Sequence, residues 1–88
     1  MYYLLIRHQV ADFAQWKTAY DVHAATRARA GLKEKELLQE VGNPNQVVML
    51  FAVEDLQRAQ DFVASADLRE AMITAGVTDK PDLFFLTR

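Results

Sequence analysis

Three short segments of this 88-residue chain are apolar at consecutive positions, at residues 3–6, 47–53 and 83–86. A strand whose sheet is covered on only one face alternates apolar and polar residues, so consecutive apolar residues are typical of strands buried on both faces. The composition agrees, because 51% of the residues are hydrophobic and only 25% are charged. A chain of this size has little interior to hold such an excess. The sequence therefore predicts a sheet with two covered faces.

The residues that cap helices and form turns divide the chain into its elements. Helix starts are expected at Asp12, at Glu54 or Asp55, and at Ser65, and helix ends at Gly31 and Gly76. Helices are then predicted over residues 12–30, 55–64 and 66–75, and strands over 2–9, 32–41, 46–53 and 81–87, with a turn at 42–45. No linker or repeat interrupts this pattern, so residues 1–88 form one domain.

The order β-α-β-β-α-β predicts an α+β, ferredoxin-like fold, in which an antiparallel sheet has helices on one face. The first and third strands are central in that fold, and they are the most apolar of the first three. The second strand lies at an edge, where its alternating charges, Lys33–Glu36, hinder unwanted strand pairing. The polarity of each strand thus agrees with its place in the predicted sheet.

The helices of such a fold cover only one face of the sheet. A second copy of the chain is the simplest cover for the other face, so we expect a homodimer with the two sheets face to face. A monomer whose two sheet faces are both moderately apolar is the alternative.

Composition also excludes several classes of function. The absence of cysteine excludes disulfide scaffolds, thiol nucleophiles and cysteine metal sites. The net charge of −2 and the lack of a basic stripe argue against nucleic acid as a partner. Neither a secretory signal nor an apolar stretch long enough to span a membrane is present, so we expect a cytoplasmic protein with no membrane partner.

The first predicted helix places a set of aromatic and polar residues on one side: Phe13, Trp16, Tyr20, His23, Ala24 and Arg27. Its aromatic part is an ordinary core-facing stripe. His23 and Arg27 extend that stripe, are four residues apart and are therefore neighbours on a helix. Polar residues in line with an aromatic stripe indicate a pocket between this helix and the sheet, with an aromatic wall and a polar end.

The predicted pocket suits acid–base chemistry on a hydrophobic small molecule. His23 is the candidate general acid or base, Arg27 the group that holds a carboxylate or stabilises an oxyanion, and Tyr20 a hydrogen-bond donor to the same oxygen. Trp16 and Phe13 are expected to bind the substrate. In the alternative interpretation, Arg27 extends to solvent and His23 only caps the core.

Arg7 and His8 are adjacent on the first strand and must point to opposite faces of the sheet. Either could join the pocket, and Arg7 is the candidate that we assign to substrate binding. Alternatively, both are half exposed where the strand ends. Two histidines far apart in sequence, with no acidic partner at a recognisable spacing, give only a weak signal for metal or haem, so we expect no metal and no cofactor.

The pattern F-x-x-W-x-x-x-Y-x-x-H-x-x-x-R-x-x-x-G over residues 13–31, together with residues 43–86, resembles small proteins of the dimeric α+β barrel superfamily. The chain is most similar to the antibiotic-biosynthesis-monooxygenase-like proteins, particularly a subset labelled cyclases. The resemblance implies the fold and a homodimer that closes a barrel. The scaffold hosts many activities, so it implies less about function.

Three interpretations remain open. One is a cofactor-independent monooxygenase or cyclase acting on a hydrophobic, aromatic or polyketide-like substrate. The second is a non-catalytic, ligand-binding or stress-responsive barrel. The third is a purely structural dimer whose own side chains fill the pocket. Haem degradation is not expected, because the third strand lacks the tryptophan and the second helical region lacks the histidine of that branch.

Overall fold

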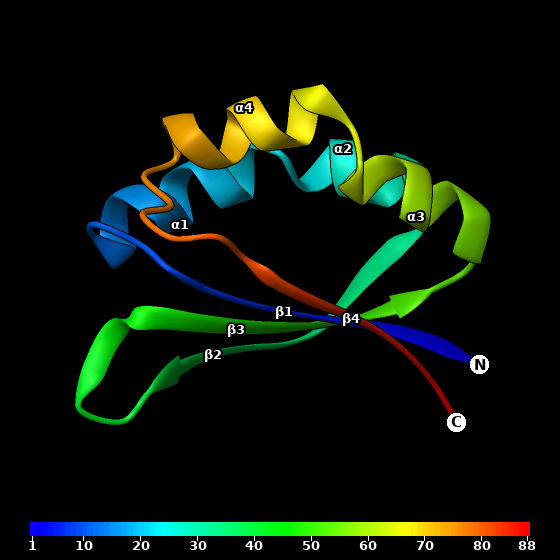
Figure 1. Cartoon of the computed structure of the whole chain (residues 1–88), viewed down its shortest axis with the longest axis horizontal. Helices are drawn as coiled ribbons and strands as arrows, with labels where there is room; N and C mark the ends of the chain where they lie inside the picture. Colours follow the sequence, from blue (N-terminus) through cyan, green and yellow to red (C-terminus); the bar gives the residue numbers. More distant parts are fainter.

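The computed structural model describes residues 1–88. Its elements are, in order, β1 (Tyr2–Gln9), α1 (Phe13–Val22), α2 (Ala24–Arg29), β2 (Leu32–Glu40), β3 (Asn43–Val53), α3 (Leu56–Val63), α4 (Ala66–Thr74) and β4 (Asp82–Thr87). The strands form one antiparallel sheet, and all the helices lie on one side of it (Figure 1). The predicted α+β, ferredoxin-like fold is therefore confirmed.

The strand order in the sheet is β2-β3-β1-β4, so the two central strands are the two that were predicted to be central. In β1 and β3, buried residues alternate with half-buried ones along most of each strand. The helix-facing set pairs across the strands, with Leu4 opposite Phe51 and Ile6 opposite Met49. These side chains form the centre of the core beneath the helices.

Three side chains cap the helices as the sequence predicts. The carboxylate of Asp12 accepts a hydrogen bond from the Gln15 N–H of α1. In the same way Asp55 accepts from the N–H of Arg58 in α3, and Ser65 from that of Leu68 in α4. The longest helix has ten residues, and none of the helices combines the length and the apolar character needed to cross a bilayer.

The single helix predicted over residues 12–30 is wrong, because it is broken at His23. At this residue φ is −90° and ψ is 12°, and its N–H is shared between the carbonyls of Ala19 and Tyr20. A shared N–H of this kind is typical of a helix end. The chain restarts as the short helix α2, and Trp16, Tyr20, His23 and Arg27 still line one common cavity across the break.

The predicted turn is also shorter than expected. The hairpin between β2 and β3 turns at Val41 and Gly42, and Gly42 has a φ of 86°, which a glycine adopts without steric strain. Pairing therefore extends into Asn43, which lies opposite Glu40. Residues 43–45, predicted as turn, belong to the start of β3.

The face of the sheet that points away from the helices is uncovered in the single chain, and it carries apolar residues beside the Arg7–Asp82 ion pair. By strand alternation and register it includes Tyr3, Leu5, Leu38, Val48, Leu50, Phe84 and Leu86. We call this set the open face. Leu38, Phe84 and Leu86 are exposed by 51%, 52% and 44%. The apolar runs thus do place hydrophobic side chains on both faces of the sheet.

The cap at the start of α3 gives a direct test of the local structure. We expect Asp55→Ala to lower the free energy of unfolding by about 1 kcal/mol, because the substitution leaves the Arg58 N–H without its acceptor. Asp55→Asn is the matched control, since an asparagine side chain can still cap. Chemical denaturation measures both. An equal loss in the two variants would contradict the assigned cap.

Candidate functional site: a cavity between the helices and the sheet

A cavity of about 340 Å³ lies between the helical layer and the helix-facing side of the sheet. Its floor comes from the central strands, its sides from α1 and α2, and its far wall from α4. The main lining residues are Ile6, His8, Met49 and Phe51 on the sheet, Trp16, Tyr20 and Arg27 on α1 and α2, and Leu68, Ala71 and Met72 on α4. A mostly apolar cavity with a few polar groups is the usual form of a small-molecule site.

One side of the cavity is an aromatic wall built by α1. Trp16 and Tyr20 are four residues apart, so they lie one above the other on the helix surface. Their rings are stacked, with centroids 4.8 Å apart and planes at 25°, and both side chains are buried. Phe13 packs on the other side of Trp16 with centroids 5.7 Å apart. Phe13 therefore supports the wall and does not line the cavity.

Arg27 closes the end of this wall. Its guanidinium carbon lies 3.5 Å from the centroid of the Tyr20 ring, and its Nη1 donates a hydrogen bond of 2.7 Å to the Tyr20 carbonyl oxygen. Burial lowers the pKa of Arg27 from its ordinary value, but a guanidinium stays protonated in proteins. Arg27 thus presents a fixed positive charge to the cavity, as the sequence predicts, and does not extend freely into solvent.

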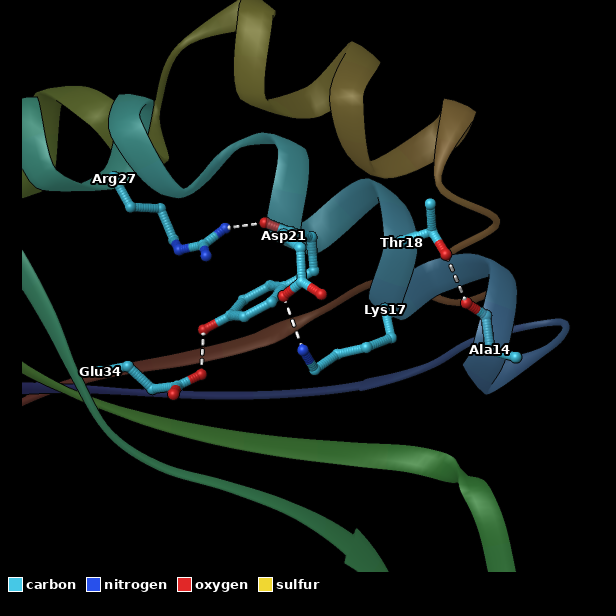
Figure 2. Close-up of polar contacts among 7 residues, drawn as sticks. Ala14, Lys17, Thr18, Asp21, Arg27 and Glu34 are labelled. Carbon is cyan, nitrogen blue, oxygen red and sulfur yellow. Dashed lines mark hydrogen bonds and ion pairs between the residues drawn. The ribbon is translucent and has the colours of Figure 1, made fainter.

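The predicted role of Tyr20 is not supported. Its hydroxyl already donates a 2.7 Å hydrogen bond to Oε1 of Glu34 on β2, as Figure 2 shows beside Arg27. Burial, and next the bond to Glu34, raise the pKa of Tyr20. This phenol is held in place by Glu34 and Arg27, so it serves as a wall of the cavity instead of a free donor to a substrate.

The other predicted residues divide between the cavity and the rest of the molecule. His23 lines the cavity, but it is exposed and sits at the helix break, at the rim of the site. Arg7 lies on the opposite side of the sheet, where its Nε donates to Asp82 Oδ2 at 2.8 Å. The assignment of Arg7 to the pocket is therefore wrong. The parity of β1 sends Arg7 to the same face as Leu5.

That same parity brings His8 into the cavity, a residue that the sequence interpretation left as a weaker candidate at a half-exposed strand end. His8 is only 2% exposed, and it is the one buried residue with a polar side chain. Its ring meets Trp16 edge to face, with centroids 5.5 Å apart. The sequence did not distinguish the two residues, because Arg7 follows Leu5 at every second position just as His8 follows Ile6.

Burial lowers the pKa of His8 from its ordinary 6.5 to about 4. The Asp79 carboxylate opposes this shift, and the charge of Arg7 adds to it. At neutral pH the imidazole is therefore uncharged, with one nitrogen able to donate and one able to accept a hydrogen bond. The site combines a neutral imidazole in its floor with a cation at the end of its wall.

The shifted pKa predicts how stability depends on pH. The unfolded chain takes up a proton at His8 below about pH 6.5, whereas the folded chain does so only below about pH 4. Stability from this group is complete above pH 6.5 and falls as the pH drops toward 4, by about 3 kcal/mol in total. Urea denaturation of the wild type and of His8→Phe, at equal protein concentration, measures the difference. His23→Gln is the control, because it retains His8. An identical pH dependence in the wild type and His8→Phe would refute the assignment.

This chain is similar to known proteins in its fold. No family model and no curated protein matches the chain. Among solved structures, a Bordetella bronchiseptica protein named after the antibiotic biosynthesis monooxygenases is 16% identical, with a TM-score of 0.78 over 99% of this chain and 95% of that one. SnoaB, a cofactor-independent oxygenase from Streptomyces nogalater, is 22% identical, with a TM-score of 0.71 over 99% and 92%. The chain has the fold of the antibiotic-biosynthesis-monooxygenase-like proteins, as the resemblance of its sequence to them predicts.

Proposed function

We propose that this protein binds a flat, hydrophobic, aromatic or polyketide-like molecule in the cavity and oxygenates it without a cofactor. The main observation is the cavity itself, in which the stacked Trp16 and Tyr20 rings end at the guanidinium of Arg27. Within this stack the ring faces of Trp16 and Tyr20 are covered by Phe13, by each other and by Arg27. The wall therefore offers ring edges to a ligand, and ring edges pack favourably against the face of a planar aromatic molecule. The shared fold with SnoaB, a cofactor-independent oxygenase, supports the same kind of activity.

The proposed reaction needs few catalytic groups from the protein. A substrate CH₂ group flanked by aryl rings or carbonyls loses a proton to a base and leaves a stabilised carbanion. The carbanion and O₂ form a peroxide after a proton is returned, and the peroxide loses water to give a carbonyl. The balance is R₂CH₂ + O₂ → R₂CO + H₂O, with O₂ as the only oxidant. The protein has to bind the substrate, stabilise its negative charge and exclude water.

Two side chains fit the steps of this reaction. Arg27 supplies a positive charge at the end of the wall, where an enolate oxygen would be stabilised. His23 lies at the exposed rim, where an imidazole can pass a proton between the cavity and solvent. We propose His23 as the proton acceptor and Arg27 as the group that stabilises the anion.

A cavity-filling variant tests the site. Anthrone is a suitable probe, since it is flat and its CH₂ group is activated by two aryl rings and a conjugated carbonyl. We expect the wild type to accelerate O₂ uptake by anthrone, and Ala71→Phe to abolish the acceleration, because Ala71 lines the cavity. Ala66→Phe is the matched control, because Ala66 is an exposed residue of the same helix. Equal rates in the two variants would exclude catalysis in this cavity.

Non-catalytic binding is the second candidate function. It is favoured by the hydroxyl of Tyr20, which is engaged with Glu34 and unavailable to a substrate. Tight binding of anthrone to the wild type without O₂ uptake, again lost in Ala71→Phe, would identify a binding protein and not an oxygenase.

We further propose that the active form is a homodimer in which the open faces of two chains pack together. Contiguous exposed apolar surface on a soluble protein usually marks an interaction site. The helical layer lies on the opposite face of the sheet and therefore does not cover the open face (Figure 1). The open face is thus the surface through which a second chain would complete the barrel.

A charge placed in the open face should separate the chains. We expect the wild type to have twice the chain mass of 10.0 kDa in solution, and Phe84→Glu to have the mass of one chain, because a carboxylate would be desolvated in the interface. Val22→Glu is the control, since Val22 is 75% exposed but lies on α1. Light scattering after size-exclusion chromatography gives both masses, and a wild type of one chain mass would rule out the dimer.

A further inference from the structure

The floor of the cavity contains a polar group that the proposed chemistry does not use. Both ring nitrogens of His8 are buried, and no protein group hydrogen-bonds to either of them. Leaving a buried polar group without a hydrogen bond costs about 1 to 3 kcal/mol. The neighbours on the same strand face are apolar, namely Ile6 and Val10. An aliphatic residue at position 8 would fit this face without that cost.

The surroundings of His8 explain why the protein itself leaves it unpaired. Val47 lies directly opposite on β3 and offers no polar side chain. From the helical layer, Trp16 meets the imidazole in an edge-to-face arrangement, with centroids 5.5 Å apart. The register of β4 on β1 reaches only to Asp82 opposite Arg7, so no β4 residue lies across from His8. His8 is one of the residues that line the cavity, so a ligand there would be its neighbour.

We propose that His8 is the hydrogen-bonding anchor of this site, and that it binds a hydroxyl group of the aromatic ligand. The inference rests on the proposed function, in that it requires a ligand in the cavity. The ligand ring would lie along the Trp16–Tyr20 wall while its phenolic or enolic O–H donates to a nitrogen of the imidazole. The anchor fixes which edge of a planar ligand faces the sheet and which edge faces Arg27, so His8 is the residue that determines orientation and specificity.

The charge state of His8 agrees with this role. A neutral imidazole retains a free lone pair, whereas a protonated one can only donate. Because its pKa is near 4, His8 can accept a hydrogen bond over the whole physiological range. Arg27, by contrast, can only donate, so His8 and Arg27 select opposite ligand atoms, while His23, Thr26, Arg29 and Asp67 are the other polar residues that line the cavity. A molecule with a hydroxyl at one edge and a carbonyl or oxyanion at another satisfies both His8 and Arg27.

A pair of probes that differ only in the hydrogen-bond donor tests this proposal. 2-Naphthol carries a hydroxyl, and 2-methoxynaphthalene has the same rings without a donor. We expect the wild type to bind 2-naphthol about 5- to 10-fold more tightly, which corresponds to one net hydrogen bond. In His8→Phe, which retains a flat ring but no nitrogen, this preference should fall to about 1, while 2-methoxynaphthalene binds about as well as before.

Met49→Leu is the matched control, because Met49 also lines the cavity from the sheet but has no hydrogen-bonding nitrogen. Its affinities for the two probes should change together and keep their ratio. Retention of the wild-type preference by His8→Phe would overturn the role of His8. Failure of the wild type to bind either probe would instead count against the cavity as a binding site, and thus against the proposed function.

A second measurement does not depend on the folding of any variant at position 8. The imidazole ¹⁵N resonances of the wild type should shift on addition of 2-naphthol and remain in place with 2-methoxynaphthalene. The chain has two histidines, so the signals are assigned by the loss of one set in His23→Gln. Unchanged His8 resonances in protein saturated with 2-naphthol would also overturn the proposal.

Discussion

The structure depends on the two-sided burial of its central strands. β1 and β3 each carry a run of consecutive apolar residues, at 2–6 and 47–53, so each face of the sheet presents hydrophobic side chains. The helices bury one set, in which Leu4 and Phe51 are almost completely inaccessible. The other set forms the open face. No element of residues 1–88 covers the open face, and this is why we propose that a second chain does.

The same arrangement leaves room for a site. The helices α1, α2 and α4 rest on the sheet through a limited number of large side chains, and a cavity remains where they do not meet. The break at His23 does not remove this side of the chain from the cavity, since Tyr20, His23 and Arg27 all line it. Arg27 folds back onto the Tyr20 ring and closes the cavity, while His23 lies at its rim.

The sequence correctly predicted the helix caps, because a cap is an interaction between residues that are close in the sequence. Asp12, Asp55 and Ser65 cap helices through N–H groups only three residues away, so their roles follow from the sequence alone. Gly42 was correctly placed in a turn, but the length of the turn was not, because it depends on how far β2 and β3 pair. The hydrogen bond of the Tyr20 hydroxyl could likewise not be predicted from the sequence, since its acceptor Glu34 is on another element.

The sequence by itself determined the order of the elements, the central position of the most apolar strands and the presence of apolar residues on both faces of the sheet. These follow from caps, turn residues and strand periodicity, which act over a few positions. Only the tertiary structure decided whether the even-numbered or the odd-numbered residues of β1 face the helices. It thereby placed His8 in the cavity and Arg7 beside Asp82. The physical reason is that alternation along a strand separates its side chains into two sets but does not specify which set faces the helices. The side on which the helices pack makes one set of side chains the core and the other the open face.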